Sequence, residues 1–213
     1  MDAISQFFHT LFSSEGLRQV VTTGGIPLLC LIIFAETGLL IGFFLPGDTL
    51  LFLAGSLSAT GEIQISIFLL IAMLIISAII GNSVGYFIGS KAGKKLFERP
   101  NSRFFNRDHL IKTHNFYEKY GGITMILARF IPIIRTFAPV VAGTVEMSKR
   151  KFTLYNIIGA ILWIGGVTAL GYFLGREFPD IIKYLQVAVI GVVIISLLLP
   201  IIQWLRTHKA PLK

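Results

Sequence analysis

The sequence predicts an all-α integral membrane protein built on an inverted repeat. Three observations lead to this prediction: the composition, the placement of the charges and a repeated motif. Hydrophobic residues make up 54% of the 213 positions, charged residues only 14%, and the mean hydropathy is +0.76. A soluble domain carries about 25% charged residues, and a soluble fold of this size has too little interior to hide so much apolar surface. The composition also excludes a disordered chain, and the single cysteine excludes a disulfide-stapled scaffold.

Three uninterrupted apolar stretches contain no charged residue: 63–90, 152–175 and 184–205. Each is long enough for a hydrocarbon core about 30 Å thick, which takes about 20 helical residues to cross. We therefore predict a transmembrane helix in each. Residues 4–22 instead place apolar side chains at helical spacing between polar ones, which favours an amphipathic helix at the membrane surface rather than a cleavable signal.

Two further apolar stretches are interrupted by charges and by helix-breaking residues. These are Glu36, Pro46, Gly47 and Asp48 within residues 25–59, and Arg129, Pro132, Arg135 and Pro139 within residues 121–145. Proline removes a helical hydrogen bond and glycine loosens the backbone, so each stretch should break into two half-helices of about ten residues. Because such a half-helix spans only half a bilayer, we predict two re-entrant hairpins, each entering and leaving on one side.

The basic residues predict the topology. Of 19 Lys and Arg residues, 14 lie in three short stretches: 91–119, 149–151 and 206–213. Short basic loops stay on the cytoplasmic side of a membrane, which places the loop 91–120, both ends of the second hairpin and the C-terminus in the cytoplasm. The first hairpin then opens on the outer face, so the two hairpins enter from opposite sides. The net charge of +8 is explained by topology, with lipid headgroups as a second partner and no need for nucleic acid.

A repeated motif supports this arrangement. Ala54-Gly55 is followed by the sequence GYFIG at residues 85–89, and Ala142-Gly143 is followed at similar spacing by GYFLG at residues 171–175. Each copy is a charged hairpin, then AG, then a spanning helix, which is the plan of many transporters. The predicted single membrane domain, 1–213, thus contains an amphipathic helix (1–24), repeat 1 (25–90), the basic loop (91–120), repeat 2 (121–176) and a C-terminal helix (181–206).

Four charged residues at bilayer depth are the candidate functional groups: Glu36, Asp48, Arg129 and Arg135. A charge there costs at least about 2.5–3.5 kcal/mol, so each needs a partner or water. Arginine presents a permanently charged fork that matches a phosphate or carboxylate, and the two acids are candidates to take up and release protons. The alternative is that the four charges only pair with one another and hold the hairpins together. Polar residues that could line the same site are Asn82, Asn156, Thr136, Tyr86 and Tyr172, with Thr136 a candidate substrate contact beside the arginines.

These residues resemble the signatures of the DedA family of bacterial inner-membrane proteins, related to SNARE-associated Golgi and VTT-domain proteins. The resemblance covers roughly residues 25–175, and its motifs are Glu36-Thr37-Gly38, Phe44-Leu45-Pro46-Gly47-Asp48, Ala128-Arg129-Phe130-Ile131-Pro132, Arg135-Thr136, Ala142-Gly143 and Leu162-Trp163. It implies opposed re-entrant hairpins, lipid transport or scrambling, with undecaprenyl phosphate recycling for some members, and functional roles for the acids at 36 and 48 and the arginines at 129 and 135. One departure is Asn82, where relatives can carry an aspartate.

The residues and the resemblance together lead us to expect a flippase that moves an anionic lipid, a polyprenyl (undecaprenyl) phosphate or a phospholipid, coupled to protons. The alternatives are a proton-dependent carrier of a small solute or cation, and a structural membrane-homeostasis factor. We expect no enzyme, cofactor or metal, because the four histidines show no ligand spacing and no nucleophile is paired with a base. Small residues at Gly81, Gly85 and Gly89 would permit packing within the chain or against a second copy.

Overall fold

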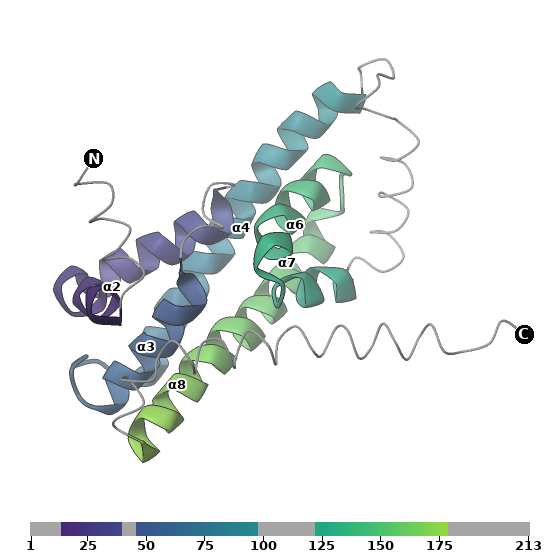
Figure 1. Cartoon of the computed structure of the whole chain (residues 1–213). Coiled ribbons are helices and arrows are strands. Elements are labelled where there is room, and N and C mark those ends of the chain that lie inside the picture. Colours follow the sequence, from purple (N-terminus) through teal and green to yellow (C-terminus); the bar gives the residue numbers. More distant parts are fainter. Residues whose placement is uncertain (1–13, 40–45, 98–121, 179–213) are drawn as a thin grey trace, which may run out of the picture.

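The computed structural model describes residues 14–39, 46–97 and 122–178, and all regular structure in these ranges is helical (Figure 1). In order, the helices are α2 (Ser14–Gly38), α3 (Gly47–Ala59), α4 (Ile67–Phe97), α6 (Pro132–Thr144), α7 (Lys149–Ala160), the π-helix η2 (Ile161–Gly165) and α8 (Gly166–Glu177). Within the described ranges, three continuous segments are long and apolar enough to cross a membrane: Gly16–Gly38, Ile67–Ala92 and Lys149–Glu177. The second and third coincide with predicted spans, while the predicted span 184–205 lies outside the described residues.

Helix α2 is kinked at the predicted boundary between the amphipathic helix and repeat 1. Gly25 has non-helical backbone angles, φ 62° and ψ −166°, and two helical segments meet there. Glycine tolerates this backbone, and Pro27, in the first turn after the kink, needs no hydrogen-bond partner for its nitrogen. One feature differs from the expectation: the two segments together, Gly16–Gly38, are long and apolar enough to cross a membrane, whereas residues up to 22 were expected at the membrane surface.

Prolines mark the starts of α3 and α6. Helix α3 begins at Gly47 with Pro46 as its N-cap, and α6 begins at Pro132 after a turn that follows the helical residues 122–128. Both helices have 13 residues, a length of about 20 Å, which is short of the roughly 30 Å hydrocarbon core. Pro139 was expected to break a helix, but it lies inside α6, which continues to Thr144. A proline inside a helix removes a single backbone hydrogen bond, and close packing on α4 supports α6 at this position.

The two repeated motifs pack in crossed pairs. Helix α3 lies along α8, and α6 lies along α4 (Figure 1). Gly55 of α3 faces the carbonyl of Thr168 in α8, and Gly143 of α6 faces the carbonyl of Tyr86 in α4, so closely that a Cβ atom at either glycine would overlap the facing backbone. Each AG motif therefore packs on the GYFxG helix of the other copy.

The glycine stripe of α4 is used inside the chain. Gly81 packs against Thr37 and the carbonyl of Phe34 in α2, and Gly89 packs against the backbone of Val140 in α6. Small residues allow two backbones to approach closely in this way. The stripe thus joins α4 to α2 on one turn and to α6 two turns later, and a homo-oligomer remains a prediction without support from these glycines.

The buried core surrounds α3. Its residues from Leu50 to Leu57 are all buried, and they pack with apolar side chains of α2, α4 and the η2–α8 segment. By contrast, large apolar side chains on the outer faces are exposed, among them Phe68 of α4 and Phe173 of α8. This pattern, a helix surrounded by helices whose outer faces are apolar, fits a protein whose surroundings are lipid.

Candidate functional site

Arg135 is the centre of a buried charge cluster. Its Nη1 donates to Oδ1 of Asp48 at 2.7 Å, and its Nη2 donates to Oε1 of Glu36. The ring of Trp163 lies 4.4 Å from the guanidinium carbon, and the indole Nε1 donates to the same Oδ1 of Asp48 at 2.7 Å. A guanidinium that binds two carboxylates and stacks on an aromatic ring uses both the fork and the faces of the group.

Helix ends and a π-helix bring these side chains together. Glu36 lies in the last turn of α2, and Asp48 lies in the first turn of α3. Arg135 lies near the start of α6, and Trp163 lies in the π-helix η2. π-Helices are rare and frequently occur at functional sites. Every member of the cluster therefore lies beside an irregularity of the backbone.

Gly47 provides the space for Glu36. A Cβ atom at position 47 would overlap the Glu36 carboxylate, so this carboxylate rests directly on the α3 backbone. The Glu36 side chain is fully buried and that of Arg135 is 6% exposed, whereas Asp48 retains 17% of its side-chain surface. Among the described residues, neither Oε2 of Glu36 nor Nε of Arg135 has a hydrogen-bond partner. The cluster thus contains two acids and one base, and Oε2 of Glu36 has no hydrogen-bond donor among the described residues.

Arg129 lies in a second, uncharged set of partners. It is 2% exposed, and its Nη2 donates to the backbone carbonyl of Asn156 at 3.1 Å and to the amide oxygen of the same residue. Asn156 also binds the amide of Asn82 at 3.0 Å, and the guanidinium stem packs on Gly159. None of the ion pairs found in the described ranges involves Arg129. The two arginines therefore have separate partners: two carboxylates for Arg135, and the amide oxygen and backbone carbonyl of Asn156 for Arg129.

The remaining expected residues take various places. Thr136 is buried, next to Arg135 in α6. Asn82 and Asn156 belong to the Arg129 set. Tyr86 donates to the carbonyl of Met147 and stacks on Phe152 at 4.3 Å between ring centroids, away from the four charges.

Tyr172 stands edge-on to Phe173 on α8. His9, His109, His114 and His208 lie outside the described residues, and within those ranges no three His, Cys, Asp or Glu side chains cluster as metal ligands would.

Residue chemistry did not predict a role for Trp163 in the charge cluster. Trp163 belongs to the family motif Leu162-Trp163, but a tryptophan in an apolar helix is usually a packing residue. The available signal was its indole N–H, since a buried tryptophan usually donates to a hydrogen-bond acceptor. Glu36 and Asp48, the two acids predicted at bilayer depth, were candidate acceptors.

Comparison with known proteins identifies the family of this chain. The model of the VTT domain family matches residues 45–173. Protein DedA of Escherichia coli is 47% identical over 197 residues, which cover 91% of this chain and 90% of that protein. A membrane protein of Mycobacterium tuberculosis is 40% identical over 195 residues, covering 92% and 85% of the two chains. No solved structure matches the chain. The match to the VTT domain model and the identity to protein DedA show that the chain belongs to the DedA family of VTT-domain membrane proteins.

Proposed function

We propose that this protein carries an anionic lipid across the bacterial inner membrane, with Arg135 as the phosphate-binding group and with proton uptake by Glu36 and Asp48 coupled to the movement. The lipid class is a polyprenyl phosphate such as undecaprenyl phosphate, or a phospholipid. One observation carries the proposal: the guanidinium best shaped to bind a phosphate is occupied by two carboxylates at once. An internal ligand of this kind must leave before a phosphate can bind.

Proton uptake provides the exchange. A protonated carboxylic acid no longer offers Arg135 a full negative charge, so a proton on Asp48 or Glu36 weakens its hold on the guanidinium. A lipid phosphate then takes the place of a carboxylate and keeps the buried charge compensated, as a charge in an apolar interior requires. Arg129 and Thr136 contribute further contacts to the phosphate in this scheme.

The proposed path uses two opposed re-entrant hairpins related by an inverted repeat. Two observations support it. Arg18, early in α2, pairs with Glu62, which follows α3, at 2.7 Å, so the chain from the start of α2 to the end of α3 begins and ends at the same end of the molecule. Lys91 near the end of α4 and Lys149 at the start of α7 line one cavity, so the segment between them also returns to the level at which it began. In this topology the basic loop 91–120 and the C-terminus are cytoplasmic.

The competing functions make different predictions. A carrier, rather than an enzyme, fits a site whose acids are engaged with an arginine and not with a nucleophile. A carrier of a cation would have to bind its substrate where Arg135 now sits. A purely structural role for the ion pairs remains the alternative to be tested, because paired charges can hold helices together without binding anything.

A charge reversal separates these readings. Because Arg135 also binds Glu36, the reversal is made together with Glu36→Gln, so that an acid at position 135 does not face a second carboxylate. The variant Glu36→Gln, Asp48→Arg, Arg135→Asp retains one pair of opposite charges but moves the guanidinium to α3. If the pair only holds the fold, this variant should complement loss of the protein in cells as well as the single variant Glu36→Gln does. Our proposal predicts that it inserts in the membrane, does not complement, and no longer retains a labelled polyprenyl phosphate in detergent. Full complementation by the reversed pair would refute a substrate-binding role.

A further inference from the structure

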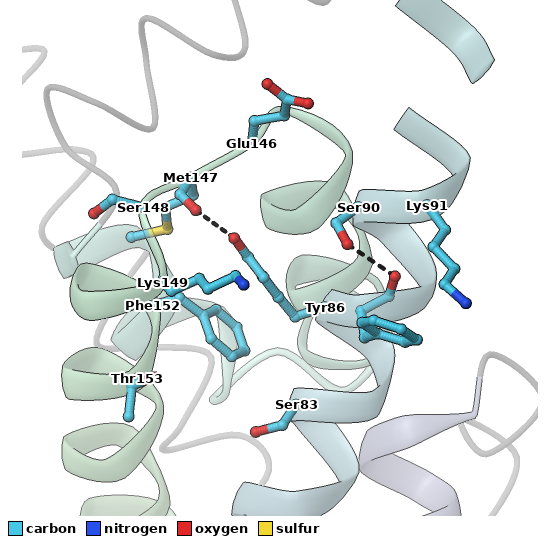
Figure 2. A pocket seen from close by; sticks show the side chains of 11 residues that line it. Ser83, Tyr86, Ser90, Lys91, Glu146, Met147, Ser148, Lys149, Phe152 and Thr153 are labelled. Carbon is cyan, nitrogen blue, oxygen red and sulfur yellow. Dashed lines mark hydrogen bonds between the residues drawn. The ribbon is translucent and has the colours of Figure 1, made fainter. Parts of the chain in front are cut away.

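A cavity separate from the charge cluster lies between the end of α4 and the start of α7. Its volume is about 640 Å³, and the polar side chains around it include Ser83, Tyr86, Ser90 and Lys91 from α4, the α7 N-cap Ser148 and Lys149 of α7 (Figure 2). None of the four charges of the central site is among its lining residues. Tyr86 crosses the space toward the residues that precede α7, where its hydroxyl donates to the Met147 carbonyl (Figure 2). The cavity is therefore a separate place, at the end of the molecule where basic residues gather.

The charges of this cavity favour an anion. Lys149, Arg150 and Lys151 fill the first turn of α7, which contains no acidic residue. A first helical turn usually carries acids, because the helix dipole makes this end positive. Figure 2 shows the Lys149 side chain extending from α7 toward α4. Lys91 also lines the cavity, but its side chain extends on the side of α4 turned away from Lys149, with its ammonium 4.4 Å from the centroid of the Phe87 ring (Figure 2). The lining contains one acid, Glu146, and two lysines, so its net charge is positive.

A neighbouring groove adds an apolar surface. It has a volume of about 450 Å³, shares Lys149 and Thr153 with the first cavity, and continues along α7 to Leu154 and Ile157. Both of these apolar side chains are open on the outer face of the helix, 54% and 37% exposed respectively. A ligand that spans the two cavities therefore meets lysine at one end and a lipid-facing apolar surface at the other.

We infer that this groove binds the headgroup of an anionic phospholipid, with Lys149 on the phosphate, Lys91 adding positive charge at the rim of the cavity, and an acyl chain along Leu154 and Ile157. Basic pockets between transmembrane helices are known sites for phospholipid headgroups. Lys149 lines both the polar cavity and the apolar groove. This favours a lipid over free phosphate as the ligand, because a soluble anion would make no contact with the apolar side chains of the groove. This lipid occupies the groove whether or not the central cluster moves a lipid, so the inference does not depend on the proposed function.

The test uses the full chain in detergent with a photoactivatable phosphatidylglycerol whose reactive group is on an acyl chain. We expect saturable labelling that maps to α7 around Leu154 and Ile157. The variants Lys149→Gln and Lys91→Gln should each weaken binding about fivefold, and the double variant about 25-fold, because each lysine contributes a similar attraction to an anionic lipid. The matched control is Arg176→Gln, which removes an exposed charge at the far end of α8.

Two further arms separate the outcomes. The titration is repeated in the Arg135→Ala variant, where binding at the groove should be unchanged although the central site is lost. It is also repeated with inorganic phosphate as competitor. Unchanged labelling in the Lys149→Gln, Lys91→Gln double variant, or labelling elsewhere than on α7, would overturn the inference. Complete displacement by inorganic phosphate would also overturn it, because the groove would then be a site for a soluble anion.

Discussion

Trp163 and Asp48 are joined by a 2.7 Å hydrogen bond from the indole N–H to Oδ1, the same carboxylate oxygen that Arg135 binds. The tryptophan ring also stacks on that guanidinium at 4.4 Å. Trp163 therefore contacts both partners of the ion pair, one through its edge and the other through its face. Any change that separates Asp48 from Arg135 must also change the surroundings of this ring, which connects the η2–α8 segment to the state of the charge cluster.

Replacing Trp163 by phenylalanine isolates the hydrogen bond. Trp163→Phe keeps an aromatic face beneath Arg135 and removes the indole donor, so a bond to a charged group worth about 1.5–3 kcal/mol is lost. Trp163→Leu removes the ring as well and should lower the thermal unfolding midpoint further. The measurement is thermal unfolding of the purified protein in one detergent. Equal midpoints for the wild type and the phenylalanine variant would show that the indole bond contributes nothing.

Gly47 should not tolerate even a methyl group. In Gly47→Ala the new Cβ would overlap the Glu36 carboxylate, so the acid must leave Arg135 or α3 must shift. We expect a large loss of complementation in cells and a lower unfolding midpoint. Gly166→Ala is the matched control, since it adds the same methyl group to a helical position with no neighbouring atom within 4 Å. If both variants behave alike, the packing of Glu36 against α3 is not important.

Gly143 tests the crossed packing of the repeats. Gly143→Ala would bring a Cβ atom onto the Tyr86 carbonyl, a backbone atom that cannot move unless α6 and α4 separate. The expected result is destabilisation of more than about 1 kcal/mol, because overpacking of this kind typically costs about 1–3 kcal/mol. Gly165→Ala, in a position without neighbours, is the control. A midpoint of unfolding for Gly143→Ala at or above that of Gly165→Ala would argue against the close crossing.

Asn156 should stabilise the protein through Arg129. Asn156→Ala removes the side-chain acceptor from a buried guanidinium and also the donor to the Ile79 carbonyl. Leaving buried polar groups without partners costs about 1–3 kcal/mol each and more for a charged one, so we expect one of the largest losses of stability among single substitutions. Ile157→Ala, at the next, exposed position, should have little effect. Comparable unfolding midpoints for the two variants would contradict the role assigned to the amide.

The sequence predicted the class of protein well because its strongest signals are local. Long apolar runs, prolines at helix starts and charges within apolar stretches are read residue by residue, and the starts of the 13-residue helices α3 and α6 follow from Pro46 and Pro132. The kink of α2 at Gly25 falls at the predicted boundary, but the sequence did not predict that the segments on its two sides together reach spanning length. Pro139 was misjudged because packing on α4, and not the local sequence, decides whether the helix continues.

The partners within the site are a property of tertiary packing. The same four charges permit several pairings, and the choice depends on which helices cross. Because α3 packs on α8 and α6 on α4, Arg135 meets both acids and Trp163, while Arg129 meets Asn156 instead. A repeat in the sequence shows that two units are alike, but it does not show that each unit packs on the other's helix.

The central claim is that Arg135 exchanges its carboxylates for a lipid phosphate when protons are taken up. The most direct measurement is the transbilayer movement of a labelled polyprenyl phosphate in liposomes containing the purified protein, with and without a pH gradient, beside the Arg135→Ala and Arg135→Lys variants. The account predicts movement that responds to the gradient, is lost in the alanine variant and is reduced in the lysine variant, which keeps the charge without the fork. Movement that persists in folded Arg135→Ala protein, at the wild-type rate and with the same response to the gradient, would contradict it.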